Sequence, residues 1–158
     1  MVSSVLMVCL GNICRSPIAE HVMRAKVVEA GLSIQVASAG TGDWHIGDPA
    51  DARAIEVLQN NGYSSEHRAR QFQPHWFEEH DLILVMDKSN RSNVLALANT
   101  DEHRKKVHML RSFDAESALD AEVPDPYYGT ASDYRNVLQM VERACDGLIA
   151  QQLEQTEE

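Results

Sequence analysis

The sequence predicts a single α/β domain built on a doubly wound, four-stranded parallel sheet with helices on both faces. Short apolar runs alternate with helical patterns along the chain, which is typical of strand–helix–strand units. The strongest strand is expected at residues 81–86 and is continuously apolar after Asp81, as expected for a strand covered on both sides. The 158 residues, 44% hydrophobic and 24% charged, fit one domain. We expect that domain at residues 1–154 and a polar tail at residues 155–158.

The first strand and the first helix are joined by a short loop. Residues 2–8 are rich in Val, Leu and Met and lead into a turn, which indicates a buried strand. Ser16 is a good N-cap, and Pro17 suits the first helical position. Helical spacing of apolar residues continues to Gly31, which is expected to end the helix. These residues predict a strand, a loop and a helix in that order.

Two further pairs of a strand and a helix follow. The second strand is expected at residues 33–37, and the glycine-rich stretch at residues 38–44 after it reads as a loop. A helix is expected at residues 48–62, where an Asp-Pro pair opens it and a glycine ends it. The strand at residues 81–86 is then followed by a helix at residues 89–99.

The last part of the chain is predicted to contain a short strand, a long loop and a final helix. The strand is expected at residues 107–110. The acidic, proline-containing segment at residues 112–130 has no periodicity, and long ordered loops are often functional. Ser132 is the expected cap of an amphipathic helix that runs through Ile149. In parallel sheets ligands bind beyond the carboxyl ends of the strands, where Cys9, Trp44, Asp87 and this loop should meet.

Charge and cysteine content exclude several classes of function. The formal net charge of -10 opposes binding to nucleic acid or to an anionic membrane surface. No apolar run is long enough to span a membrane, and the start of the chain lacks the pattern of a secretory signal. Three cysteines, an odd number, do not form a disulfide framework and suit a reducing compartment. We expect a cytoplasmic protein that is a monomer or a weak homo-oligomer.

The segment Cys9-Leu-Gly-Asn-Ile-Cys-Arg-Ser16 contains the residues with the strongest chemical signal. Successive backbone N–H groups of such a loop can cradle an anion, and the start of the following helix adds partial positive charge. Arg15 supplies a planar fork for two phosphate oxygens. Thiols beside cations and helix N-termini ionise at neutral pH, so Cys9 is the candidate nucleophile and Ser16 a donor to its sulfur. The predicted phosphate-binding residues are Leu10, Gly11, Asn12, Ile13, Cys14, Arg15 and Ser16, with Gly11 and Asn12 of the types that tolerate left-handed backbone angles.

The chain resembles the low-molecular-weight protein tyrosine phosphatases over nearly its whole length. The motif V-C-L-G-N-I-C-R-S-P is similar to the family's Cys-x5-Arg-Ser loop, and D-P-Y-Y-G at residues 125–129 to its Asp-Pro loop. S-A-G-T-G-D-W-H at residues 38–45 and V-M-D-K-S-N at residues 85–90 also look like the family. The resemblance implies hydrolysis of phosphotyrosine and small aryl phosphates through a phosphocysteine intermediate, without a cofactor or a metal.

The resemblance also implies roles for individual residues. Asp125 would be the general acid that protonates the departing tyrosine oxygen and then the base that activates water. Trp44, Tyr127 and Tyr128 would line the mouth of the pocket as apolar walls. Cys14 matches the second cysteine of many members, which is positioned to trap oxidised Cys9 as a disulfide. Loop support is assigned to Asn12, Ser38 and Asp87.

Two other functions remain open from the sequence. An arsenate reductase on the same fold would use the same cradle and cysteine, although its thioredoxin-coupled forms need further cysteines that residues 86–125 lack. A non-catalytic phosphotyrosine-binding module would be signalled by loss of Cys9, Arg15 or Asp125, all of which are present. The expected partner is a phosphotyrosine-containing protein, and a tyrosine kinase is one candidate because bacterial relatives often act on such kinases.

Overall fold

Four parallel strands form one sheet in the order β2-β1-β3-β4 in the computed structural model, which describes residues 2–157. The strands are β1 (Ser4–Cys9), β2 (Gln35–Gly40), β3 (Leu82–Val85) and β4 (Val107–Met109). β1 is central and pairs in parallel with both β2 and β3. The strand that follows β1 lies on one side of it and the next strand lies on the other, so the strand order reverses at β1. In such a sheet, the crevice beyond the carboxyl end of this strand is the expected ligand position.

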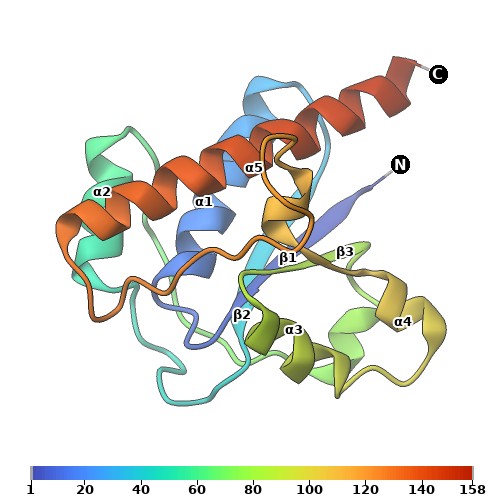
Figure 1. Ribbon diagram of the computed structural model, residues 1–158, viewed down its shortest axis with the longest axis horizontal. Coiled ribbons are helices and arrows are strands. Elements are labelled where there is room, and N and C mark those ends of the chain that lie inside the picture. The colour runs from blue at the N-terminus through green and yellow to red at the C-terminus, as the bar shows by residue number, and fades with distance from the viewer. Residues whose placement is uncertain (1, 158) are drawn as a thin grey trace.

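Helices cover both faces of the sheet, as predicted (Figure 1). One face carries α1 (Arg15–Glu29), α2 (Ala52–Asn60) and the long α5 (Ala131–Glu157), and their apolar sides form the larger core cluster. On the other face the chain forms α3 (Lys88–Leu95), α4 (Asp101–Lys105) and the 3-10 turn η1 (Pro74–Phe77). A second 3-10 turn, η2 (Leu110–Phe113), follows β4.

The pleat of β1 divides its side chains between two separate cores. Val5 and Met7 belong to the cluster beneath α1 and α5, whereas Leu6 and Val8 belong to the cluster on the opposite face. All four side chains are fully buried. This double burial explains why the strand reads as a continuous apolar run rather than as an alternating one.

Several element boundaries differ from the sequence prediction. β2 includes residues 38–40, which were expected in a loop, because this stretch pairs with the end of β1. The second helix begins at Ala52 with Asp51 as its N-cap, not at the earlier Asp-Pro pair. α4 and both 3-10 turns were not predicted, because segments this short carry no readable period. α5 continues through residue 157, so the described part of the expected polar tail is helical.

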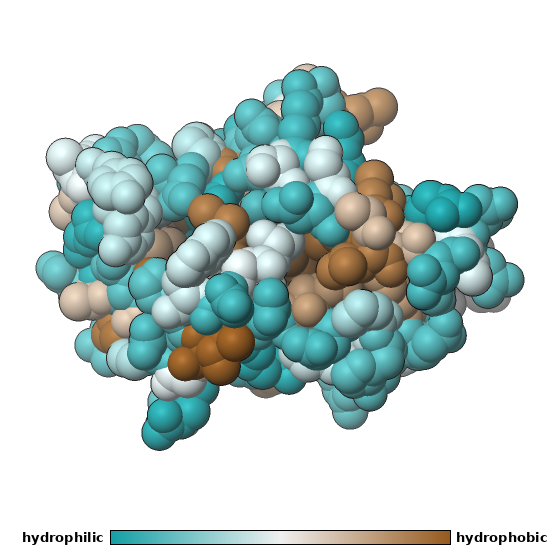
Figure 2. Space-filling model, turned by 90° about the horizontal axis from the view of Figure 1, so that it is seen from below, coloured by the Kyte–Doolittle hydropathy of each residue, from teal (hydrophilic) through white to brown (hydrophobic). Residues whose placement is uncertain are grey.

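The outside of the molecule is mainly polar. Figure 2 shows one face on which hydrophilic residues cover most of the surface and hydrophobic residues gather in a few patches. Across residues 2–157 no helix combines the length and the apolar character that a membrane crossing needs. Five of the exposed large hydrophobic or aromatic residues come from loops beyond β1 and β2 and from residues 125–129: Leu10, Trp44, Ile46, Tyr127 and Tyr128.

Candidate active site

The loop between β1 and α1 turns sharply around Asn12. Asn12 has a φ of 58°, in the left-handed region that asparagine tolerates better than most residues. Gly11 was also expected to use this region but does not, and its lack of a side chain serves packing, since a Cβ there would lie 3.2 Å from His45 Cδ2. Gly40, on the neighbouring strand, allows a still closer approach: its Cβ would lie 2.7 Å from the Leu10 carbonyl oxygen.

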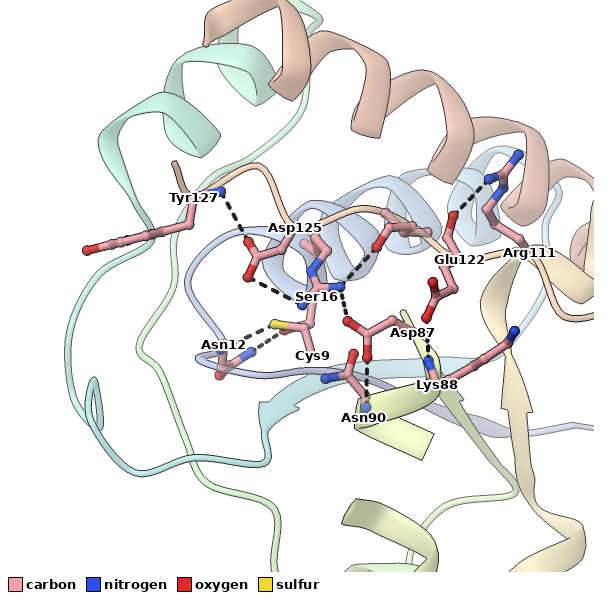
Figure 3. A network of polar contacts seen from close by, with 12 residues as sticks. Cys9, Asn12, Ser16, Asp87, Lys88, Asn90, Arg111, Glu122, Asp125 and Tyr127 are labelled. Atoms are coloured by element: carbon pink, nitrogen blue, oxygen red, sulfur yellow. Dashed lines mark hydrogen bonds and ion pairs between the residues drawn. The ribbon is translucent and has the colours of Figure 1, made fainter. Parts of the chain in front are cut away.

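The Cys9 sulfur lies at the base of this loop and is almost fully buried. Its Sγ is 2.9 Å from Ser16 Oγ, and the backbone N–H of Asn12 donates to it at 3.3 Å. Ser16 was expected to cap α1, yet the helix begins at Arg15, two residues earlier than expected, and Cys14 is its N-cap without a side-chain bond. The Ser16 hydroxyl is instead directed to the sulfur (Figure 3).

The Asn12 side chain holds the loop from behind the sulfur. Its Nδ2 donates to Ser16 Oγ at 2.8 Å and to Ser38 Oγ at 2.9 Å, and its Oδ1 accepts from the backbone N–H of Arg70. Ser38 in turn donates to Glu20 on α1. All polar groups of the Asn12 amide are therefore used to join the loop to β2 and to the segment after α2, which favours one loop shape.

Arg15 is the buried cation of the site. Its Nη1 donates to Asp87 Oδ2 at 2.7 Å and to the Val123 carbonyl oxygen at 2.9 Å, and its Nη2 lies 3.6 Å from Asp125 Oδ2. Burial opposes the charge, but Cys9, Asp87 and Asp125 together raise the pKa of Arg15 above its ordinary value. In Figure 3 the side chain of Asp87, which follows β3, and that of Asp125, in the 112–130 loop, both point toward one guanidinium group. The guanidinium is therefore fixed in direction and charged.

A pocket of about 310 Å³ opens above the loop. Trp44 and Tyr127 stand at its sides, and Asp125 lies at its edge, where its Oδ1 accepts from the Tyr127 backbone N–H at 3.1 Å. Tyr128 is 96% exposed and touches the pocket from outside. The lining residues are Cys9, Leu10, Gly11, Ile13, Cys14, Arg15, Trp44, His45, Asp125, Tyr127 and Tyr128. Asn12, Ser16, Ser38 and Asp87 do not line it, but each makes a hydrogen bond within the network around Cys9 and Arg15.

Cys14 is placed differently from Cys9. Its Sγ is 3.2 Å from the hydroxyl oxygen of Tyr134, a residue of α5 that is itself buried. Burial raises the pKa of the Cys14 thiol to about 12, against a hydrogen bond from Tyr134 that lowers it. Cys14 is therefore a protonated thiol at neutral pH in this arrangement.

Sequence reasoning missed several residues around the pocket. His45 lines it beside Trp44, and its Nδ1 is 3.2 Å from Asp48 Oδ2. Arg53 and Tyr134 lie behind the 125–129 segment, where Arg53 binds two of its carbonyl groups. The position next to Trp44 was the available signal for His45, whereas Arg53 and Tyr134 read as ordinary helix residues. Within residues 2–157 no group of three or more His, Cys, Asp or Glu side chains is arranged to hold a metal ion.

The model of one protein family matches residues 4–158, and its description is low molecular weight phosphotyrosine protein phosphatase. The chain belongs to this family. It is 47% identical over 160 residues to the low molecular weight protein-tyrosine-phosphatase of Streptomyces coelicolor, covering 99% of this chain and 98% of that one. Identity to the human low molecular weight phosphotyrosine protein phosphatase is 42% over 145 residues, with 90% of each chain covered.

The solved structures agree with the family assignment. A protein tyrosine phosphatase from Entamoeba histolytica, crystallised with Hepes in its active site, aligns with a TM-score of 0.90 at 34% identity and covers 99% of both chains. Members of the low molecular weight phosphotyrosine protein phosphatase family are cysteine-dependent hydrolases, so the chain is an enzyme of the phosphatase class. These findings do not favour the arsenate reductase.

Proposed function

We propose that this enzyme hydrolyses phosphotyrosine in proteins, and small aryl phosphates, in two steps through a phosphocysteine on Cys9. The observation that carries the proposal is the arrangement of three groups around one pocket. A buried sulfur bonded by Ser16 and Asn12 forms its base, the Arg15 guanidinium lies beside it, and the Asp125 carboxyl stands at its edge. These are a nucleophile, an oxyanion-binding cation and a proton donor within reach of one substrate.

In the first step the Cys9 thiolate attacks the phosphorus atom and the bond between phosphorus and the tyrosine oxygen breaks. The electron pair of that bond goes to the phenolic oxygen, which takes a proton from Asp125. Arg15 and the backbone N–H groups of the loop bind the equatorial phosphate oxygens, where charge is spread in the transition state. The products are an unphosphorylated tyrosine residue in the substrate protein and the phosphocysteine on Cys9.

In the second step water replaces the sulfur. The Asp125 carboxylate takes a proton from the water molecule, whose oxygen attacks the phosphorus atom. The bond between sulfur and phosphorus breaks, and its electron pair returns to Cys9 as a thiolate. Ser16, 2.9 Å from the sulfur, donates a hydrogen bond to this leaving group. Inorganic phosphate is released, and the enzyme regains its initial state.

The pocket walls support an aromatic phosphate ester as the substrate. Trp44 and Tyr127 line the pocket and offer apolar faces to a phenyl ring. The proposed substrate is a phosphotyrosine-containing protein, with a tyrosine kinase as one candidate. We further propose that the enzyme acts in the cytoplasm as a monomer or weak homo-oligomer, and that Ser38, Asn12 and Asp87 keep the phosphate loop in shape.

The first test replaces the nucleophile. Cys9→Ser is expected to lose turnover of p-nitrophenyl phosphate while still binding inorganic phosphate, because the hydroxyl is not ionised but the loop and Arg15 remain. Arg15→Lys is expected to lose both, because an ammonium cannot replace the fork. Turnover is measured by absorbance and phosphate binding by calorimetry. Retained turnover in Cys9→Ser would disprove the phosphocysteine mechanism.

The second test isolates the general acid. Asp125→Asn should slow phosphorylation of Cys9 by about 10²–10⁴-fold for phenyl phosphate, whose leaving oxygen needs a proton. The loss should be much smaller for p-nitrophenyl phosphate, because its anion leaves more readily without help. The measurement is single-turnover hydrolysis of a series of aryl phosphates, plotted against leaving-group pKa, with circular dichroism to confirm folding. Parallel slopes for the two enzymes would remove Asp125 from the role and direct the search to Asp87, Asp114 and Asp120.

A further inference from the structure

The segment that carries Asp125 has little regular structure of its own. Residues 125–129 form the last part of the 112–130 loop before α5, outside any helix or strand. The Asp125 side chain is 42% exposed and lies 3.6 Å from Arg15 Nη2, which is longer than a hydrogen bond. A general acid must nevertheless meet its oxygen at hydrogen-bond distance. Some other contact has to determine where this segment lies.

Arg53, in the first turn of α2, provides such a contact. Its Nη2 donates to the Tyr127 carbonyl oxygen at 2.8 Å and its Nη1 to the Gly129 carbonyl oxygen at 3.1 Å. One side chain thus binds two backbone groups on the carboxyl-terminal side of Asp125. One residue, Tyr128, lies between these two carbonyl groups, so the fork of a guanidinium suits them better than a single ammonium would.

Arg53 is itself held in place by its neighbours. Its Nε and Nη2 donate to the two carboxyl oxygens of Asp51 at 3.0 and 3.1 Å, and its guanidinium lies 4.8 Å from the centre of the Tyr134 ring. The hydrogen bonds that Arg53 donates to Asp51 raise the pKa of Arg53 above its ordinary value. Burial alone would raise the pKa of Asp51, but hydrogen bonds from Arg53 bring it below its usual value. Both partners therefore remain charged across the physiological range.

The same group of residues also contacts the phosphate loop. The backbone N–H of Asp51 donates to the Ile13 carbonyl oxygen at 2.8 Å, and the Tyr134 hydroxyl lies 3.2 Å from Cys14 Sγ. Asp51, Arg53 and Tyr134, which we call the brace, thus touch the phosphate loop on one side and residues 127–129 on the other. Through these contacts the separation of Cys9 and Asp125 depends on the brace.

We propose that Arg53 is a positioning residue for the general acid, which holds residues 125–129 where the Asp125 carboxyl meets the leaving oxygen. The proposal rests on the function proposed above for Asp125. Arg53 does not line the pocket, and the phosphate oxygens are bound by Arg15 and the loop. Loss of Arg53 should therefore impair proton transfer to the leaving group and leave phosphate binding intact.

The test repeats the aryl phosphate series with Arg53→Met and Arg53→Lys. Both variants should phosphorylate Cys9 about 10- to 100-fold more slowly with phenyl phosphate, a part of what a general acid contributes, and lose less with p-nitrophenyl phosphate. The dependence on leaving-group pKa should be steeper than in the wild type, and the dissociation constant of inorganic phosphate should change less than about threefold. The control is Arg135→Met, which removes an exposed arginine on α5 next to Tyr134 and should leave the slope unchanged.

A double variant separates this proposal from the one on which it rests. If Arg53 acts through Asp125, then Asp125→Asn with Arg53→Met should match Asp125→Asn alone within about twofold, since coupled residues are not additive. The role of Arg53 is overturned if the two losses add in full, or if both Arg53 variants keep the wild-type slope while Asp125→Asn has a steep one. Either result leaves Asp125 as the acid. A wild-type slope in Asp125→Asn itself overturns the acid. If Arg53→Met fails to fold, Arg53→Lys decides the question. A folded Arg53 variant that no longer binds inorganic phosphate overturns the positioning role.

Discussion

Cys9 and Cys14 belong to the same short loop but face different partners. The Cys9 sulfur is hydrogen-bonded to the Ser16 hydroxyl and the Asn12 N–H, and Cys9 lines the pocket. The Cys14 sulfur lies against the hydroxyl of Tyr134, and burial raises the pKa of its thiol to about 12. The thiolate is the reactive form of cysteine, and this difference in surroundings supports our proposal that the two thiols have different tasks.

The proposed protective role of Cys14 predicts a pH-dependent disulfide. Peroxide first converts Cys9 to a sulfenic acid, and the Cys14 thiolate then attacks that sulfur and expels hydroxide. Because the pKa of Cys14 is raised to about 12, its thiolate fraction, and with it the rate of disulfide formation, should rise about tenfold per pH unit between pH 7 and 9. Peroxide is removed with catalase, and the Cys9–Cys14 disulfide is followed by peptide mapping.

Two variants make this prediction specific. Cys14→Ser should recover less activity than the wild type when a thiol reductant is added after the same peroxide treatment. Cys145→Ser should behave as the wild type, because Cys145 is fully buried on α5 and does not line the pocket. Equal recovery of Cys14→Ser and wild type would show that Cys14 has no resolving role.

At the scale of elements, α5 contacts two separate segments near the site. It contributes Tyr134 to the brace near its start, and further along it packs against η2, which leads into the 112–130 loop. The contact with η2 is unusually close at Gly147, where a Cβ would lie 1.8 Å from the Phe113 carbonyl oxygen. Glycine within a helix costs stability, so its presence here reflects the space that η2 occupies.

Gly147→Ala should therefore destabilise the protein. At an open helix position this change adds about 1 kcal/mol of stability, because alanine has the higher helix propensity. Here the backbone of η2 must move, and overpacking of this kind costs about 1–3 kcal/mol or more. The free energy of unfolding is measured with urea. Gln151→Ala, an exposed position on the same helix, is the control and should change stability by less than about 0.5 kcal/mol. A gain in stability in Gly147→Ala would contradict the packing argument.

At the scale of the whole molecule, β1 links both cores and the site. Its side chains reach the clusters on the two faces of the sheet, and its carboxyl end carries Cys9. The packing on each face therefore includes residues of this one strand. This arrangement supports our proposal that residues 1–154 form one domain that unfolds as a unit.

Unfolding should occur in a single transition that phosphate shifts. Trp44 lies in the loop at the pocket, and Trp76 lies in η1 against the core cluster on the face of the sheet that carries α3. Tryptophan fluorescence and circular dichroism should therefore give the same urea midpoint. Inorganic phosphate at a hundred times its dissociation constant should raise the free energy of unfolding by about 2.7 kcal/mol. Arg15→Lys should show no such gain. Two separate transitions would show that the chain is not one cooperative domain.

The sequence by itself determined the fold class and the loop for which we propose the phosphate chemistry. Apolar runs and helical periods depend on neighbouring residues, so they were readable without coordinates. The loop was readable for the same reason, because Cys9, Asn12, Arg15 and Ser16 lie within eight consecutive residues that contact one another. Asp125 and Trp44 lie far from the loop in sequence, and family resemblance rather than periodicity pointed to them.

Only the tertiary structure decided how distant residues support the site. Arg15 meets Asp87 and Val123 across 72 and 108 positions of the chain, and Arg53 meets Tyr127 across 74. Such pairings follow from how strands and helices pack, and no local pattern encodes them. Packing also explains why the Ser16 side chain does not cap α1 as expected, because its hydroxyl lies against the sulfur of Cys9. Local periodicity therefore specifies the elements, whereas the orientation of the reacting groups depends on contacts that exist only in the folded chain.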